Sequence, residues 1–469
     1  MVFAEVFQPF LEDRPVSVMF RGTLDNIFRA ERLDRLFEQV AVKQHTGELL
    51  FSTCADLLSL VVLKARKSVH AAYVARREQV AVSVKSVYDK LAGIETAVSE
   101  QLVRETAADL AHVVDELRGA RKGPLPGFEV RILDGNHLAG TDHRIRETRR
   151  LVAAVLPGQT LCVLDPQRQL LRDVVTGENG HANERTLIPA VLPRVQAGQC
   201  WIADSLFCTL EFLFEMRERR AYFLLRQHGQ LHGELQGKRK KAGRCSTGVV
   251  YEQELLVRRK DGTATTVRRI TIVRDKPTRR GEHEVHLLTN LPAKVKVAKA
   301  AEAYLGRWSI ETAFQDLTTT LRCEINTLGY PKAALFGFCL ALVLFNIVSV
   351  VKAALRAGAQ GTTEQKEKLS MYYLSDEIAG VSRGMAIAIP AAHWEATFGT
   401  LTPKQLAAKL HWLARKVDLR PFQTNPWTPK KPQPKPKRLS GNRGNHVSTY
   451  ELLLQRGKPA APSRAKAKT

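Results

Sequence analysis

The spacing of apolar residues predicts helices throughout the first quarter of the chain. Apolar side chains recur every three or four positions in five segments, at residues 24–40, 54–67, 69–81, 83–91 and 98–117. No strand-like alternation of any length interrupts them. We interpret residues 1–120 as a helical N-terminal domain. It suits a helix-turn-helix reader of DNA, although a plain helical bundle shows the same pattern. The segment RGARKGPLPG, residues 118–127, predicts a linker.

The pattern changes to alternation at residue 128, where FEVRILD predicts a strand that ends at Asp134. Further strands are predicted at 161–164, 170–175, 199–203 and 222–226, with helices at 183–195 and 209–219. Strands that first follow one another and then alternate with helices predict a mixed sheet flanked by helices. In α/β sheets functional groups gather beyond the carboxyl ends of strands. Asp134 and Asp204, which each end a predicted strand, are therefore expected at such a place.

Residues 229–290 interrupt this alternation with three strand-like runs, at 249–257, 265–273 and 284–288. We interpret them as an all-β insertion between a first part of the core at 128–228 and a second part at 291–420. The insertion carries 14 Lys and Arg against 7 Asp and Glu. Such an excess favours a surface that faces DNA, and the alternative is a solvated sheet with exposed charge.

The chain then returns to helical spacing, with one helix predicted over 298–322 and others at 333–355, 371–378 and 403–417. Residues 333–351 contain no charge, and a helix of that length can cross a bilayer. A helix buried on all sides has the same composition, and Asn346 and Ser349 favour this second interpretation. Residues 421–469 are rich in Pro and Lys, with 11 basic residues and one acid, and predict a disordered basic tail.

Composition narrows the class of partner. The 469 residues carry a formal net charge of +24 with a pI near 9.9, which predicts a polyanionic partner, with nucleic acid first and an anionic membrane surface second. The seven Cys show no CxxC pair, so we expect reduced, buried thiols rather than a zinc site. The first residues lack a signal-peptide pattern. Together these features predict a cytoplasmic protein.

One helix face gathers the remaining candidate chemistry. Tyr304, Arg307 and Glu311 are spaced by three and four residues, so they share a face. On its own such a set is usually a solvated ion-pair ladder, and a single Asp is more often a turn residue than a ligand. Together with Asp134 and Asp204, Glu311 completes three carboxylates, which could hold two Mg²⁺ ions that clamp a phosphodiester. We expect Asp134 to bridge the two metals.

These segments resemble the DDE transposases of the insertion-sequence-four family, over most of residues 20–360. LDGNHL surrounds Asp134, WIADSLFCT surrounds Asp204, and YLGRWSIE carries Tyr304, Arg307 and Glu311 at the spacing of the family signature, which ends in a Lys seven residues after the Glu. The resemblance implies an RNase H-like core with Asp134, Asp204 and Glu311 as catalytic metal ligands, two Mg²⁺ ions or Mn²⁺ in their place, and no membrane. It implies a bacterial homodimer that binds terminal inverted repeats in double-stranded DNA, then cuts and transfers the element to target DNA.

The signature Lys is absent, because this chain has Thr318 at that position. We expect Arg322, placed about one turn further along a continuous helix, to take over its phosphate contact. Tyr304 and Arg307 are expected to contact the same DNA strand, and Trp308 to stack on a base drawn out of the duplex, with core packing as its alternative. Two other functions stay open, namely another RNase H-like nuclease and a catalytically inactive, transposase-derived DNA-binding protein.

Overall fold

The computed structural model describes residues 3–278, 281–424 and 446–455. Its N-terminal part is helical, as predicted, and two helices begin at Ser caps, since Ser68 and Ser83 accept backbone N–H groups. The single helix predicted over 24–40 is instead two, because Phe28 leaves helical geometry with ψ 43°. The helices are α1 (Gln8–Asp13), α2 (Pro15–Ile27), α3 (Ala30–Val40), α4 (Phe51–Val62), α5 (Val69–Ala75), α6 (Val84–Gly93) and α7 (Thr96–Leu117).

A nine-stranded mixed sheet forms the centre of the molecule, in the order β4-β3-β1-β5-β6-β10-β9-β8-β7. Its first five strands have the RNase H-like arrangement, in which β1, β5 and β6 are parallel while β3 and β4 form an antiparallel hairpin beside β1. These strands are β1 (Glu129–His137), β3 (Gln159–Asp165), β4 (Leu170–Gly177), β5 (Gln199–Ala203) and β6 (Tyr222–Arg226). The predicted fold class is confirmed.

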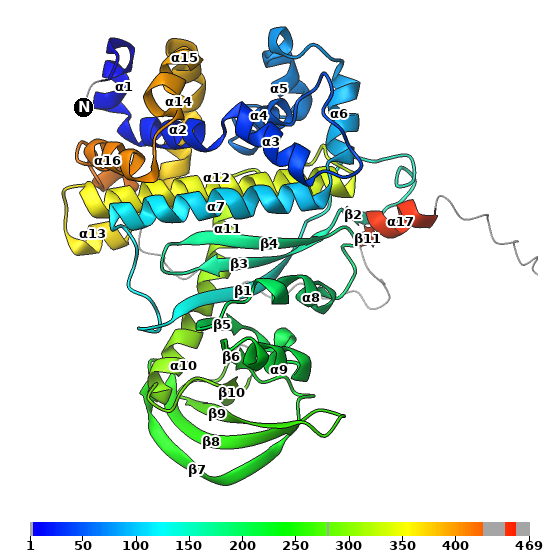
Figure 1. The fold of residues 1–469 in the computed structure, drawn as a ribbon, viewed down its shortest axis with the longest axis vertical. Helices are drawn as coiled ribbons and strands as arrows, with labels where there is room; N and C mark the ends of the chain where they lie inside the picture. The colour runs from blue at the N-terminus through cyan, green and yellow to red at the C-terminus, as the bar shows by residue number, and fades with distance from the viewer. Residues whose placement is uncertain (1–2, 279–280, 425–445, 456–469) are drawn as a thin grey trace, which may run out of the picture.

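The all-β insertion extends this sheet instead of standing apart from it. Strand β10 pairs antiparallel with β6, and β9, β8 and β7 follow in order. Figure 1 shows them as a curved wing at the end of the molecule opposite the N-terminal helices. Four strands are present rather than the predicted three, because the exposed basic segment around Lys240 also pairs. The strands are β7 (Glu234–Cys245), β8 (Gly248–Arg258), β9 (Ala264–Arg274) and β10 (Glu284–Thr289).

Two layers of helices cover the core of the sheet. One face packs with α7, α11 and α12 and continues into the N-terminal helices, while α8 and α9 cover the other. Figure 1 shows α7 and α12 side by side along β4. Asn346 in α12 fixes this contact, because its side chain accepts from Leu171 N and donates to Leu171 O, at 2.8 and 2.9 Å. The helices are α8 (Ile188–Val191), α9 (Leu210–Glu218), α10 (Val297–Leu305), α11 (Ser309–Thr320) and α12 (Pro331–Gly358).

Helix α12 is the apolar segment that raised the membrane question. It is long and apolar enough to cross a bilayer, but its most apolar 18-residue window is entirely buried inside the protein. This burial supports the interpretation as a core helix. All seven Cys are also buried and free of disulfides, as predicted.

The C-terminal part adds helices α13 (Thr363–Glu367), α14 (Met371–Ala388), α15 (Ala391–Trp394) and α16 (Pro403–Ala414). The predicted disordered tail is partly wrong, because β11 (His446–Ser448) pairs in parallel with β2 (Ala154–Leu156) and continues into α17 (Thr449–Gln455). The rest of that tail prediction concerns residues 425–445 and 456–469, which lie outside the described residues.

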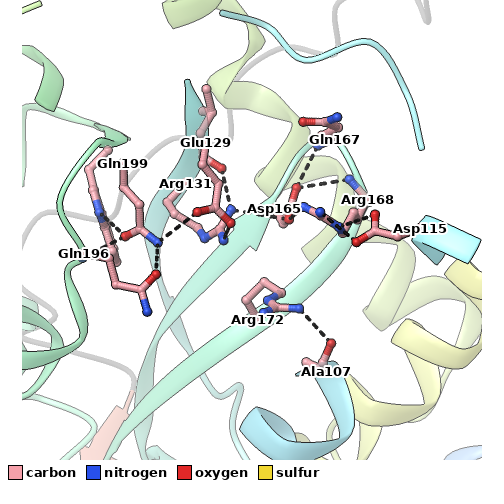
Figure 2. A network of polar contacts seen from close by, with 12 residues as sticks. Ala107, Asp115, Glu129, Arg131, Asp165, Gln167, Arg168, Arg172, Gln196 and Gln199 are labelled. Carbon is pink, nitrogen blue, oxygen red and sulfur yellow. Dashed lines mark hydrogen bonds and ion pairs between the residues drawn. The ribbon is translucent and has the colours of Figure 1, made fainter. Parts of the chain in front are cut away.

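A polar network closes the end of the sheet where β1 begins (Figure 2). Buried Asp165 accepts backbone N–H groups of Gln167 and Arg168 and pairs with the guanidinium groups of Arg168 and Arg131. Arg168 also binds Asp115 of α7 through two hydrogen bonds of 2.8 and 2.9 Å. This network ties the β3–β4 turn to α7 and β1. The candidate chemistry lies toward the opposite end of β1.

Candidate active site

The two aspartates lie beside each other where two parallel strands separate. The last residue pair between β1 and β5 is Leu133 with Ala203, so Asp134 and Asp204 come next on adjacent strands. Asp134 does not end its strand as predicted, because β1 continues to His137 against β3. Asp204 does follow its strand directly, and it caps a 3₁₀ turn by accepting Leu206 N at 2.8 Å.

Glu311 reaches the same place from across the face of the sheet. The helix predicted over 298–322 is broken, because a 3₁₀ turn (Gly306–Trp308) separates α10 from α11. Arg307 lies in this turn, between Asp134 and Glu311. Its Nη1 lies 2.8 Å from Asp134 Oδ2, and its Nη2 lies 2.8 Å from Glu311 Oε1. The structure therefore brings Asp134, Asp204, Arg307 and Glu311 together.

The site carries more negative than positive charge. Burial raises the pKa of Asp134 from 3.8 to about 6, and Asp204 and Glu311 raise this pKa further while Arg307 lowers it. Nearby like charges disfavour the ionised form of Asp134, because its carboxylate would add a further negative charge. One guanidinium thus compensates three neighbouring carboxylates incompletely, which is the charge balance expected of a site that takes up a cation.

The two aromatic residues of the signature segment occupy different environments. Tyr304 is 7% exposed in the core beside Arg307, and burial raises the pKa of its phenol to about 12. Trp308 is 58% exposed, and the guanidinium carbon of Arg307 lies 5.2 Å from its ring centroid. Trp308 is therefore not core packing, and its face is open to a ligand. The expected DNA contacts of Tyr304, Arg307 and Trp308 remain predictions.

Thr318 and Arg322 differ from the expectation of a continuous helix. The hydroxyl of Thr318 hydrogen-bonds Phe314 O and Gln315 O of its own helix. Helix α11 ends at Thr320 and Leu321 is extended, so Arg322 does not lie one turn further on the same helical face. Its Nη1 instead donates to Lys67 O at 2.6 Å, in the loop after α4. The predicted position of Arg322 was wrong, and its predicted phosphate contact loses this support.

Two neighbours of the site were missed. Arg226 is the last residue of β6, as Asp204 is the first residue after β5. Against the larger effect of burial, its charge lowers the pKa of Tyr304, and its guanidinium lies 2.6 Å from the Glu282 carboxylate. The rule about strand ends would have found it. Glu184 packs over Gly135, where an added Cβ would lie 2.3 Å from its carboxylate. No local pattern in the sequence indicates Glu184, because the contact spans distant segments.

The donor set fits Mg²⁺ in kind, although the described arrangement is not a closed metal cage. Oxygen ligands from Asp134, Asp204 and Glu311 are those that Mg²⁺ prefers. Among the residues that the structure describes, no group of three His, Cys, Asp or Glu side chains is gathered tightly enough to hold a metal. Arg307 occupies one oxygen of Asp134 and one of Glu311. These three acids would hold a metal once Arg307 releases them.

The wing has less free positive charge than its composition suggests. Arg239, Arg244, Arg258, Arg259 and Arg268 all pair with acids. Three lysines of the exposed edge strand β7, at positions 238, 240 and 241, make no ion pair within the described part of the chain. Exposed lysines on an edge strand also prevent strand pairing between molecules. The wing's contact with DNA therefore remains a prediction.

Comparison with known proteins bears on the catalytic core. Residues 126–346, a little under half of the chain, match the family model described as "Transposase DDE domain". A search of curated proteins gives no match. A solved piggyBac transposase synaptic complex with hairpin DNA aligns over 94% of this chain and 89% of its own, with 10% identity and a TM-score of 0.35, and a similarity this low does not establish a shared fold. The family match supports a DDE transposase, with residues 126–346 as the segment that resembles its DDE domain.

Proposed function

We propose that this protein is a cut-and-paste transposase of the insertion-sequence-four family. It cuts DNA at the terminal inverted repeats of an insertion sequence and transfers the freed strand to target DNA. The observation that supports this proposal best is the meeting of Asp134, Asp204 and Glu311 from three separate elements, with one arginine bridging Asp134 and Glu311. We place its action in the bacterial cytoplasm, on nucleoid DNA, as a homodimer that synapses two ends.

Divalent metal bound by the three acids would supply the Lewis acid that activates the attacking oxygen and stabilises the leaving oxygen. The protein's own residues do the positioning. Asp204 is oriented by its hydrogen bond from Leu206 N, and Asp134 by one from Gly135 N at 3.0 Å. Arg307 moves from the carboxylates to a DNA phosphate, since a guanidinium matches both partners in geometry.

The proposal is tested by cleavage of a duplex that carries the DNA flanking the gene, in Mg²⁺ or Mn²⁺. Glu311→Gln is expected to bind this duplex and leave it uncut. Asp316→Asn is the matched control, because Asp316 is an acid on the same helix whose charge faces Lys352 of α12 instead of the site. Cleavage by the wild type and the control alone supports the metal–carboxylate mechanism, and undiminished cleavage by Glu311→Gln overturns it.

A catalytically inactive, DNA-binding descendant is the second candidate, and Thr318 is the observation that favours it. Binding without cleavage by the wild type would support this candidate. Another RNase H-like nuclease would instead cut the duplex without preference for the repeat ends.

A further inference from the structure

The loop that joins α4 to α5 packs against the C-terminal end of the helix that carries Glu311. Lys64 Nζ donates a hydrogen bond to Thr319 O at 2.8 Å. In the other direction, Arg322 N donates to Val62 O at 2.8 Å and Arg322 Nη1 donates to Lys67 O at 2.6 Å. The loop and the helix end therefore hold each other through bonds made by both partners.

The loop is held in one particular conformation. Lys64 has a φ of 61°, the left-handed region that residues with a Cβ rarely adopt. An unfavourable backbone geometry persists only where surrounding contacts determine it. Here backbone bonds that end α4, from Lys64 N to Val61 O and from Arg66 N to Leu60 O, set this geometry as a C-terminal cap. The bond from Lys64 to α11 and those from Arg322 to the loop carbonyls then hold the capped loop against α11.

Helix α11 has no basic residue in its last turn, and its Thr318 hydroxyl is turned back onto the helix. Thr318 lies seven residues after Glu311, hence on the same face and about 10 Å further along the axis. The ammonium group of Lys64 lies at this end of the helix, where the partial negative charge of the terminal carbonyls favours a cation. The tertiary structure thus places a lysine from another domain beside a helix end that lacks one.

This charge is free to act on a partner. Lys64 and Lys67 are exposed, and neither makes an ion pair with an acid among the residues the structure describes. The bond to Thr319 O uses one of the three N–H donors of the Lys64 ammonium group. Two donors therefore remain for a ligand.

We propose that Lys64 and Lys67, positioned by Arg322, form a contact surface for the phosphate backbone of the DNA held at Glu311. The inference rests on the proposed function, because it requires DNA to lie along α11. It assigns to the α4–α5 loop the anchoring of the DNA beyond the cleavage point. It also gives Arg322 a positioning role in place of a direct phosphate contact.

The test is the salt dependence of duplex binding, measured by fluorescence anisotropy in the presence of Ca²⁺. Each phosphate contact contributes about 0.9 to the slope of log affinity against log salt. We expect Lys64→Gln with Lys67→Gln to lower this slope by about 2 and Lys64→Arg to preserve it. Lys404→Gln, an exposed lysine at the start of α16, is the control and should leave the slope unchanged.

Thermal unfolding separates this role from simple capping. Loss of one exposed hydrogen bond costs only about 1 kcal/mol, so Tm should change little in Lys64→Gln. A variant with lower Tm and an unchanged slope shows that Lys64 only caps the helix, which overturns the inference. If the wild type binds duplex DNA steeply and the double variant binds identically, this inference fails while the proposed function stands. If the wild type binds no duplex, both fail.

Arg322→Ala tests the positioning role separately. We expect it to lower the salt slope as the double lysine variant does, although both lysines remain, because the loop loses the bonds to Arg66 O and Lys67 O. An unchanged slope in Arg322→Ala would show that the loop holds its place without this residue and would remove Arg322 from the surface.

Discussion

Neutralising Asp134 should change how the stability of this protein depends on pH. The pKa of Asp134 is raised from 3.8 to about 6, chiefly by burial. A carboxyl group with a raised pKa in the folded state contributes stability that is fully present below pH 3.8 and is lost as the pH rises through 6. At about 1.4 kcal/mol per pH unit the whole effect is about 3 kcal/mol, of which about 1.4 kcal/mol falls between pH 5 and pH 8.

Asp134→Asn removes this titration. The variant also loses charge pairing with Arg307, which costs about 1.5–3 kcal/mol at a hydrogen bond to a charged group. The loss of this pairing matters most at pH values where the wild-type carboxylate is ionised, and the pKa of about 6 already reflects the pairing with Arg307. The free energy of unfolding of the wild type therefore falls by about 1.4 kcal/mol between pH 5 and pH 8, and that of the variant does not. This difference is expected whichever of the two proteins is more stable at pH 5.

The assay is thermal unfolding followed by tryptophan fluorescence, in chelator, at several pH values between 5 and 8. For large domains 1 kcal/mol shifts Tm by about 2–4 °C. The Tm of Asp134→Asn should therefore rise by about 3 °C relative to the Tm of the wild type between pH 5 and pH 8. Asp165→Asn is the control, since Asp165 is 1% exposed and fully partnered by two backbone N–H groups and two arginines, and its loss should destabilise at every pH. Parallel pH profiles of Tm for the wild type and Asp134→Asn would refute the reasoning.

Adding Mg²⁺ at pH 8 should raise the Tm of the wild type and leave that of Asp134→Asn unchanged.

Three other substitutions test buried contacts of the sheet and of α12. Burial lowers the pKa of Lys352 from 10.5 to about 8, so its charge destabilises the folded state below pH 8 and this effect is lost as the pH rises toward 10.5. Lys352→Met should therefore raise the free energy of unfolding at pH 7 by up to about 3 kcal/mol. The variant should also flatten the Tm profile between pH 7 and 10. Asn346→Leu leaves both backbone groups of Leu171 without their partner, and urea unfolding should show a loss of about 2–4 kcal/mol. Gly135→Ala places a methyl group 2.3 Å from the Glu184 carboxylate and should cost about 1–3 kcal/mol in the same assay, with no cost if Glu184 moves aside freely.

The sequence by itself determined the elements of the core. Alternation of apolar and polar residues located β1, and short apolar runs located β4, β5 and β6, which are buried on both faces. Helical spacing located α7, and an uncharged apolar run located the buried helix α12. The prediction that Asp134 and Asp204 lie side by side is confirmed, although its premise holds only for Asp204. Strand β1 continues to His137, and the two residues are neighbours because the pairing of β1 with β5 stops just before them. The basic composition pointed to a polyanionic partner.

Only the tertiary structure decided which groups meet across long separations. The wing joins the main sheet because β10 pairs with β6. The sequence did not predict β7, because a strand that is exposed along nearly its whole length shows no periodic apolar residues. Helical spacing already placed Arg307 beside Glu311, four residues further along. The second contact of Arg307, with Asp134, joins residues 173 positions apart, and only the packing of α11 against β1 decides it.

The approach of Lys64 to Thr319 spans 255 residues, and no local pattern records it. Periodicity reports which side of an element is buried, whereas the pairing of one charged group with another depends on how whole elements dock. For this protein the sequence therefore determined most of the strands and helices and pointed to one kind of chemistry. The tertiary structure decided that Arg307 bridges Asp134 and Glu311 and that Lys64 of the N-terminal helices lies at the far end of α11.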